Sequence, residues 1–307
     1  MHLDHFLKIT DLTPDSARAL LQRALDIKAG KETPQLPGKT LALLFEKPSL
    51  RTRTSFDVAM YQMGGHCLYL SPDEVDIGKR ESIRDVALVL SRFVQAIAAR
   101  TFTQDTVEQL AKWGTVPVIN ALSDTEHPCQ ALADILTLWE YKKTLSGLTI
   151  AYIGDANNCS NSLMYLAAMT GVHFRIASPD GYQVSPKRLA EARAIAEATQ
   201  ATVSAMTDPA EAVRNVDAVY TDVWTSMGQE DETDVRKQVF RPYQINEALL
   251  SAAKPDVMLL HPLPAHHGDE VAEGVLYRQH SAVFDQAENR LHAQKAILAA
   301  LLAETAP

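Results

Sequence analysis

Cysteines are few in this sequence, and hydrophobic runs long enough to cross a membrane are missing from it. The 307 residues include three cysteines, Cys67, Cys129 and Cys159, without any Cys-x-x-Cys spacing. This sparse, odd-numbered set excludes a disulfide framework and a cysteine zinc site, and it favours a reducing cytoplasm. No stretch approaches the length of a transmembrane helix, and the first residues show no signal-peptide pattern. We therefore expect a cytoplasmic protein without a membrane role.

Positive charge is also in deficit, because 29 lysines and arginines face 38 aspartates and glutamates, for a formal net charge of −9. This balance argues against nucleic acid or an anionic membrane as a general partner. Any anion site must therefore come from a local cluster of basic side chains. The hydrophobic and charged fractions, 46% and 22%, are ordinary for a globular protein, and the length predicts about two domains.

The sequence is rich in apolar runs that alternate with amphipathic helical patterns. The runs predict strands at residues 40–44, 66–70, 94–99 and 116–120, and again at 148–155, 173–177, 218–222 and 257–261. This alternation predicts an α/β fold with two doubly wound parallel sheets. Residues 71–80 are expected to form a polar loop. A turn-rich segment at residues 142–147 divides the chain into expected domains 1–143 and 144–307.

In the first half, polar side chains gather where the predicted strands end. The segment Ser49–Arg53 lies between the first strand and a helical pattern that starts near Phe56. It should therefore lie at a helix N-terminus, where free N–H groups and arginines suit a small oxyanion such as phosphate. Arg100 ends the third strand, and His127 and Gln130 follow the fourth. Because ligands bind at the carboxyl ends of parallel strands, these residues predict one site.

In the second half, the strand ends carry a different set of polar groups. Asn157 and Asn158 follow one predicted strand, and Asp222 is the only carboxylate at the end of another. A lone carboxylate suits an ammonium group, and an asparagine amide can pair with a carboxylate or an amine. These residues predict a second subsite with a polarity opposite to that of the first.

The motifs at these strand ends resemble those of the carbamoyltransferase family. Two of them, Ser-Leu-Arg-Thr-Arg at 49–53 and His-Pro-Cys-Gln at 127–130, are similar to that family's carbamoyl-phosphate loops. Motifs of the second half narrow the resemblance to the ornithine carbamoyltransferases: Gly-Asp-Ala-Asn-Asn at 154–158, Asp-Val-Trp-Thr-Ser-Met-Gly at 222–228, Leu-Pro-Ala-His at 263–266 and Phe-Asp-Gln-Ala-Glu-Asn-Arg at 284–290. The resemblance covers nearly the whole chain.

This resemblance implies an architecture and a reaction. It implies domains of similar size, a C-terminal helix that packs back on the N-terminal domain, a homotrimer, and neither metal nor cofactor. The implied reaction transfers the carbamoyl group of carbamoyl phosphate to the δ-amine of L-ornithine, giving L-citrulline and phosphate in arginine biosynthesis.

The resemblance also assigns residues to each substrate. Those expected to bind carbamoyl phosphate are Ser49, Leu50, Arg51, Thr52, Arg100, His127, Gln130, Pro262, Leu263 and Arg290, and three of them, Arg51, Arg100 and His127, are expected to be catalytic. Those expected to bind ornithine are Asn158, Asp222, Ser226 and Met227.

The sequence departs from the family pattern at three positions. Leu50 replaces a second hydroxyl residue, although its backbone N–H remains, and Asp76 stands where a glutamine is common. A carboxylate would repel phosphate, so Asp76 receives no ligand role. Pro262 stands where the ornithine enzymes carry a cysteine and the aspartate enzymes a proline.

Other functions were weighed against the same residues. Aspartate as acceptor would bring two carboxylates beside Asp222 and the acidic segment 230–232, which is unfavourable. Putrescine and acylated ornithine remain open as acceptors. A nucleotide-binding module would need three spaced glycines, whereas only Gly154 follows the strand. The adjacent His266 and His267 do not present both rings to one ion, so no metal site is expected.

Overall fold

The computed structural model describes residues 3–225 and 230–303. They form two units, one made of Met1–Leu136 with Glu288–Pro307 and the other of Thr137–Ala287. We call them the first and the second unit and describe each by itself. Within the described residues, no helix has the length and apolar character that a membrane crossing requires.

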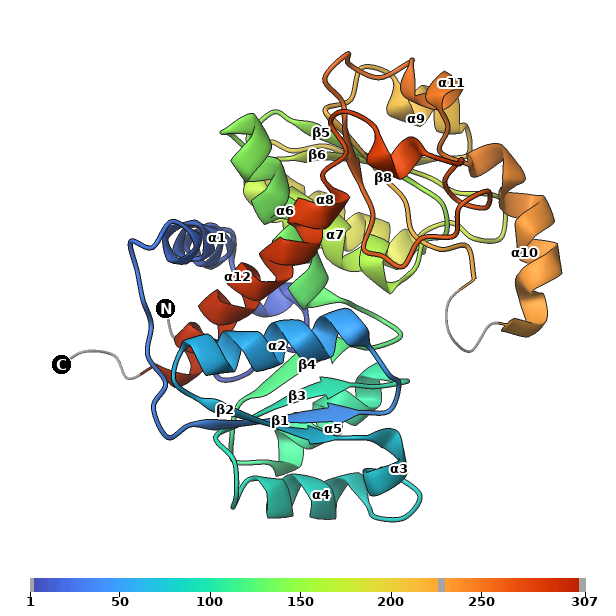
Figure 1. The fold of residues 1–307 in the computed structure, drawn as a ribbon. Coiled ribbons are helices and arrows are strands. Elements are labelled where there is room, and N and C mark those ends of the chain that lie inside the picture. Colours follow the sequence, from blue (N-terminus) through green and yellow to red (C-terminus); the bar gives the residue numbers. More distant parts are fainter. Residues whose placement is uncertain (1–2, 226–229, 304–307) are drawn as a thin grey trace. The chain divides into compact units, whose positions relative to one another are not determined.

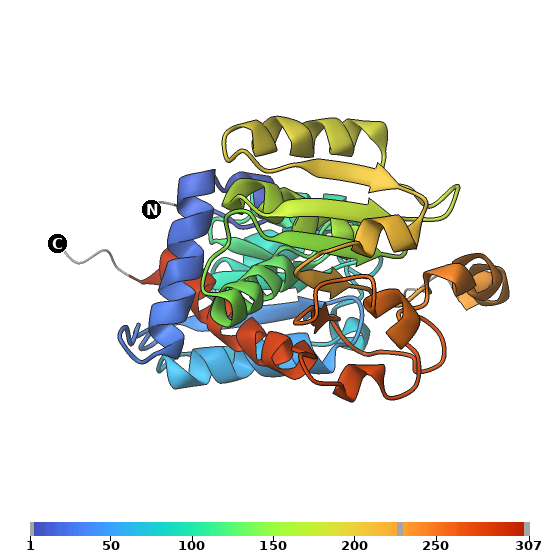
Figure 2. The ribbon, with the colours of Figure 1, turned by 90° about the horizontal axis from the view of Figure 1, so that it is seen from above.

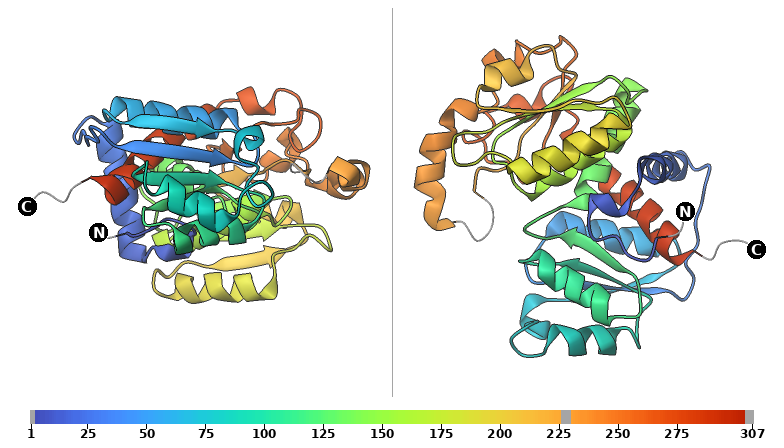
Figure 3. Two further views of the ribbon diagram at one scale, coloured as in Figure 1. Left: turned by 90° about the horizontal axis from the view of Figure 1, so that it is seen from below. Right: turned by 180° about the vertical axis from the view of Figure 1, so that it is seen from behind.

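The first unit is a parallel four-stranded sheet in the order β2-β1-β3-β4. Its strands are β1 (Thr40–Phe45), β2 (His66–Leu70), β3 (Ala96–Arg100) and β4 (Val118–Leu122), and its helices are α1 (Pro14–Lys28), α2 (Leu50–Gln62), α3 (Pro72–Val75), α4 (Ile83–Leu90), α5 (Gln104–Trp113) and the start of α6 (Pro128–Lys142). Helix α2 lies over one face, whereas α4 and α5 lie side by side on the other (Figures 1 and 3).

The apolar pattern explains this layering. Val86 and Leu90 of α4, together with Val107 and Leu110 of α5, pack in one buried cluster with strand residues such as Ile97. Burying each of these side chains contributes on the order of 1.5–3 kcal/mol, so the two helices are fixed against the sheet. The strand ends on which the site depends are therefore held by a packed core.

The second unit is a parallel five-stranded sheet in the order β7-β6-β5-β8-β9. Its strands are β5 (Thr149–Ile153), β6 (His173–Ala177), β7 (Val203–Met206), β8 (Ala218–Tyr220) and β9 (Met258–Leu260), and its helices include α7 (Asn158–Thr170), α8 (Pro186–Glu197), α9 (Pro209–Val213), α10 (Thr233–Phe240) and α11 (Glu247–Leu250). Helix α8 runs beside the edge strand β7 (Figure 2). The prediction of two parallel α/β sheets is thus confirmed.

The last helix, α12 (Val283–Leu302), returns to the first unit, to which the chain from Glu288 onward belongs. Arg290 on this helix contacts both α2 and α6, so the expected packing of the C-terminal helix on the N-terminal half is confirmed.

The structure differs from the sequence predictions in three local details. Residues 72–75 of the expected polar loop form α3, because Ser71 and Glu74 make a capping box that satisfies N–H groups of this turn. Helix α2 begins at Leu50 and not near Phe56, because Ser49 caps it. Strand β7 was missed because it is a four-residue edge strand with only Val203 fully buried.

Each sheet has a topological switch point, where the chain leaves neighbouring strands in opposite directions. In the first sheet this point lies between β1 and β3, and in the second between β5 and β8. Ligands of doubly wound sheets bind at such points. The segments that follow β1, β3, β5 and β8 are therefore the places to look for function.

Candidate active site

In the first unit, Ser49 caps the helix that follows β1. Its backbone is extended, and its hydroxyl accepts the N–H of Thr52 at 3.3 Å and donates to the Thr52 hydroxyl at 3.0 Å. Leu50 opens the helix with a side chain that is 77% exposed, so only its backbone is available to a buried ligand. The first turn thus presents backbone N–H groups, two hydroxyls and the positive end of the helix, as the sequence predicted.

Arg100 lies beside this turn because β3 pairs with β1. It is the last residue of β3, aligned with Phe45, and its side chain is buried. The loop is tied down by Glu46, whose N–H donates to the Arg100 carbonyl at 2.8 Å and whose carboxylate accepts the N–H of Phe102 at 2.6 Å. Burial raises the pKa of Glu46 above its ordinary value. Glu46, which the sequence reading did not single out, therefore fixes the two strand ends to each other.

Arg290 joins three segments that are far apart in the sequence. Its Nη1 donates to Gln130 Oε1 at 2.7 Å, and its Nη2 donates to the Thr52 hydroxyl at 3.2 Å. Gln130 in turn donates to Asp134 at 2.8 Å. Thr52, Gln130 and Arg290 are all at least 98% buried. The structure therefore brings together residues from α2, α6 and α12 that the resemblance had assigned to one ligand.

His127 precedes α6 and is 5% exposed. Burial, and then the positive charges of Arg290, Arg100 and Arg51, hold its pKa well below the ordinary value of 6.5. The imidazole is therefore neutral at physiological pH, and the three arginines surround it closely enough to act on it. A neutral imidazole can donate a hydrogen bond to a carbonyl oxygen, and clustered guanidinium groups bind phosphate. Seven predicted residues (Ser49, Arg51, Thr52, Arg100, His127, Gln130 and Arg290) thus occupy one region of the first unit.

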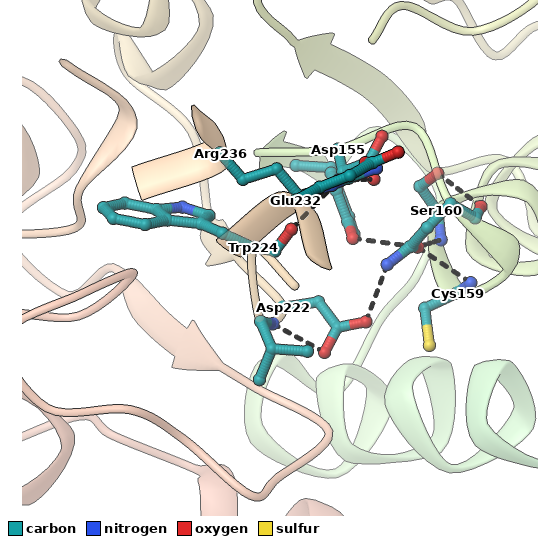
Figure 4. A network of polar contacts seen from close by, with 10 residues as sticks. Asp155, Cys159, Ser160, Asp222, Trp224, Glu232 and Arg236 are labelled. Atoms are coloured by element: carbon teal, nitrogen blue, oxygen red, sulfur yellow. Dashed lines mark hydrogen bonds and ion pairs between the residues drawn. The ribbon is translucent and has the colours of Figure 1, made fainter. Parts of the chain in front are cut away.

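In the second unit, Asp222 follows β8 at the other switch point. Its Oδ2 accepts the side-chain N–H of Asn157 at 2.8 Å, and its Oδ1 accepts the backbone N–H of Val223 at 2.8 Å. Figure 4 shows Asp222 below the Asp155–Arg236 pair and to the left of Cys159. The carboxylate is thus held in one orientation at the sheet edge, where an ammonium group could reach it.

Asn157 was predicted to lie at this strand end, but the ligand role was assigned to its neighbour Asn158 alone. It caps α7, and its Oδ1 accepts the N–H groups of Cys159 and Ser160 at 3.0 and 3.1 Å and the hydroxyl of Tyr152 at 3.1 Å. Because Oδ1 is committed to these three donors, Nδ2 must face Asp222. The available signal was the preference for asparagine at the N-cap of a helix.

Tyr152 supports this arrangement from below. Burial, followed by the charge of Asp222, raises the pKa of Tyr152 well above 10, so its hydroxyl keeps the proton that it donates. Its ring stacks on Tyr220 with centroids 5.3 Å apart, which joins β5 to β8. Asn158, the predicted ligand, is the first residue of α7 and is half-buried.

Arg236 on α10 ties the segments after β5 and β8 together. Its Nη1 donates to Asp155 at 2.7 Å and to the Trp224 carbonyl at 3.0 Å, and its Nε donates to Glu232 at 2.8 Å (Figure 4). Burial raises the pKa of Asp155, although the bonded guanidinium opposes that effect. The predicted residues Ser226 and Met227 lie outside the residues that the structure describes.

Pro262 and Leu263 follow β9, the strand next to β8. Pro262 is buried, and Leu263 is half-buried with a left-handed backbone at a φ of 57°. Across the described part of the chain, no group of three histidine, cysteine or acidic side chains is arranged to hold a metal ion.

Two family models match the chain. The model for the carbamoyl-P binding domain of aspartate/ornithine carbamoyltransferase matches residues 4–140, and the model for its Asp/Orn binding domain matches residues 146–301. The chain belongs to the aspartate/ornithine carbamoyltransferase family.

Known members of this family are similar to the chain over almost its full length. A relative from Halalkalibacterium halodurans, named ornithine carbamoyltransferase, is 52% identical over 96% of this chain and 94% of its own. A relative from Pyrococcus furiosus, named ornithine carbamoyltransferase, anabolic, is 47% identical over 96% of this chain and 95% of its own. The solved ornithine carbamoyltransferase from P. furiosus superposes with a TM-score of 0.94 at 46% identity, over 98% of this chain and 97% of that one.

Proposed function

We propose that this member of the carbamoyltransferase family transfers the carbamoyl group of carbamoyl phosphate to the δ-amine of L-ornithine, giving L-citrulline and phosphate. The full-length similarity to enzymes named ornithine carbamoyltransferase supports the reaction. The observation that carries the choice of acceptor is the single oriented carboxylate of Asp222 in the second unit.

Carbamoyl phosphate is assigned to the first unit because its charges match. Phosphate carries up to two negative charges, and Arg51, Arg100 and Arg290 supply three positive ones around a neutral His127. The Thr52 hydroxyl and the backbone N–H groups of Ser49 and Leu50 offer further donors at the helix N-terminus, and Gln130 offers its amide to the carbamoyl end. Pro262 and Leu263 are also proposed to bind carbamoyl phosphate.

Ornithine is assigned to the second unit because Asp222 suits its α-ammonium group. Asn158 is proposed to pair with the α-carboxylate or α-amine. Ser226 and Met227 are retained as ornithine-binding residues on the strength of the sequence motif. An aspartate acceptor would instead place a second carboxylate against Asp222, at a cost that no cation bonded to Asp222 offsets among the described residues.

The chemistry is an acyl transfer. The neutral δ-amine attacks the carbamoyl carbon while Arg51, Thr52 and His127 polarise the carbonyl oxygen. The bond between that carbon and the phosphate oxygen then breaks, and the amine proton is passed to the departing phosphate. The arginines stabilise the negative charge that grows on the leaving group, and holding both substrates in place supplies much of the remaining acceleration.

The remaining expectations form part of the same proposal. We place a carbamoyl-phosphate-binding domain in residues 1–143 and an ornithine-binding domain with the C-terminal closing helix in residues 144–307, and the family models at residues 4–140 and 146–301 support this division. We also propose a homotrimer in the cytoplasm. All three cysteines are free, which is consistent with a reducing compartment.

The test is an assay of ureido-product formation from carbamoyl phosphate, run in parallel with ornithine, putrescine, aspartate and lysine. We expect ornithine to give the highest kcat/KM, at least about 100-fold above that of aspartate, because Asp222 should repel the second carboxylate of aspartate. A higher kcat/KM with aspartate would show that Pro262, which matches the aspartate enzymes, indicated the acceptor correctly and that Asp222 does not bind the acceptor. A higher value with putrescine would show that no α-carboxylate is recognised.

A further inference from the structure

The loop after β9 carries no regular secondary structure, yet three of its backbone N–H groups donate to buried side chains. The N–H of His261 donates to Gln286 Oε1 at 2.8 Å, that of Leu263 to His261 Nδ1 at 2.9 Å, and that of His266 to Glu270 Oε1 at 2.6 Å. His261, Glu270 and Gln286 are each fully buried. Pro262 and Pro264 have no N–H, so these side chains, and not a backbone ladder, determine the path of the loop.

The same contacts fix the protonation of the His261 ring. Since Nδ1 accepts the N–H of Leu263, this nitrogen carries no proton. The proton of the neutral ring must then be on Nε2, which lies 3.2 Å from Glu270 Oε1 and donates to it. Glu270 Oε1 therefore holds both ends of the turn, through the His261 ring and the His266 backbone.

Leu263 is the residue that this arrangement restrains most directly. Its φ of 57° is a left-handed conformation that a branched residue adopts only when its surroundings impose it. Its N–H is turned inward to His261, and within residues 3–225 and 230–303 no group donates to the carbonyl of Pro262 or Leu263. Two carbonyl oxygens are thus available as acceptors at the carboxyl ends of the strands of the second sheet. They follow β9, which lies next to β8, the strand that precedes Asp222.

We propose that Glu270 and His261 are positioning residues that hold the Leu263 main chain so that a carbonyl of this loop accepts a hydrogen bond from a substrate amine or amide. This inference rests on the proposed function, which places Pro262 and Leu263 at the substrates. It gives the loop a particular importance in this chain, because Pro262 offers no side-chain thiol. The contribution of the loop to catalysis must then come from its main chain, and the main chain depends on Glu270 and His261.

The two ring nitrogens can be tested separately. Asparagine places its amide near the position of Nδ1 and keeps an acceptor for Leu263, whereas glutamine places its amide near Nε2 and keeps a contact to Glu270. We expect His261→Gln to lower kcat/KM with ornithine by about 10–100-fold, the range expected from a misplacement of about 1 Å. His261→Asn should retain at least about five times more activity than His261→Gln. Matched melting temperatures would show that the difference is not one of folding.

Glu270 provides a second pair of variants in case changes at His261 prevent folding. Glu270→Gln keeps an oxygen for both donors and should stay within about threefold of the wild type, whereas Glu270→Ala should lose about 10-fold or more. His267→Ala is the control, because this exposed side chain only stacks on Tyr277 in the same loop region. Nitrogen-15 NMR of His261 should report the tautomer protonated at Nε2.

The outcomes separate this inference from the proposed function. A wild-type protein that carbamoylates ornithine, together with folded His261→Gln and Glu270→Ala variants of unchanged kcat/KM, would overturn the inference alone. Equal losses in Glu270→Gln and Glu270→Ala would also overturn it, because they would show a role for charge and not for geometry. A wild-type protein inactive with every amine would overturn the proposed function, while the NMR tautomer would still decide the local geometry.

Discussion

Replacing Asn157 with aspartate tests how Asp222 is held. Aspartate has nearly the same shape and is as good an N-cap as asparagine, so its oxygens can still accept the N–H groups of Cys159 and Ser160. What changes is the group that faces Asp222 Oδ2, 2.8 Å away, which becomes a carboxylate oxygen in place of an N–H donor. The variant therefore removes one donor and adds one negative charge without altering the helix.

The magnitude follows from two terms. A hydrogen bond to a charged group contributes about 1.5–3 kcal/mol, and two like charges about 4 Å apart at a half-exposed site repel by about 4 kcal/mol. Part of the repulsion is relieved because the pair takes up a proton, which raises the apparent pKa of the two carboxylates. The net charge near ornithine is then little changed, but the Asp222 carboxylate is no longer held in its original orientation. We expect KM for ornithine to rise by about 30–1,000-fold at pH 7 and to recover partly as rising pH ionises the pair.

The assay compares steady-state kinetics with carbamoyl-phosphate affinity measured by calorimetry. The affinity for carbamoyl phosphate should change by no more than about twofold, because its proposed charged ligands, Arg51, Arg100 and Arg290, lie in the first unit. Asn246→Asp is the matched control, since Asn246 caps α11 through Leu249 and lies outside the proposed site. Asp222→Asn gives the reference effect of losing the carboxylate itself. An Asn157→Asp enzyme with normal KM and an unchanged pH profile would refute the reasoning, because it would show that Asp222 does not depend on this contact.

Three further predictions concern the remaining site. Arg51→Ala should abolish carbamoyl-phosphate binding without unfolding the protein, and unchanged affinity by calorimetry would rule out Arg51 as a ligand. The pKa of His127 is depressed in the folded state, so the unfolded state binds more protons below about pH 6.5. The wild type should therefore lose up to about 1.4 kcal/mol of unfolding free energy per pH unit in acid that His127→Gln does not lose. The same pH dependence of urea unfolding in both proteins between pH 7 and 5 would contradict this. Wild-type activity should climb into the alkaline range, because roughly one alkyl amine in a thousand is neutral at pH 7. Pro262→Cys should move this pH profile towards neutral pH or leave it unchanged. An inert wild type with an active Pro262→Cys variant would contradict ornithine as the acceptor of the natural protein.

The fold was predictable because short stretches of sequence are enough to indicate both the buried strands and the polar groups at their ends. The apolar run before Ser49 and the run ending at Arg100 each predict a strand, and the rule that parallel strands share an edge brings their ends together. The contact of Arg290 with Thr52 is different. It joins residues 238 positions apart, so no local pattern contains it, and only the resemblance to a family indicated it.

The supporting residues were less predictable for a physical reason. Asn157 and Asn158 are chemically identical neighbours, and which of them caps the helix depends on where the helix begins. The pattern placed that start at Asn161, whereas the structure starts it at Asn158. Arg236 was missed because a surface-like position on α10 gives no sign that its guanidinium is buried between Asp155 and Trp224.

Pro262 and Asp222 indicate different acceptors. Pro262 matches the aspartate enzymes, but proline has no side-chain group that would select a carboxylate. Asp222 does select, because its charge attracts an ammonium and repels a carboxylate, and an attraction of about 4 kcal/mol alone corresponds to about 1,000-fold. The amide of Asn157 cannot reverse this preference, since its N–H is already committed to Asp222 and its oxygen to three other donors. An incoming dicarboxylate would therefore meet the Asp222 carboxylate without compensation from the Asn157 amide, and the residue with the larger energetic effect decides for ornithine.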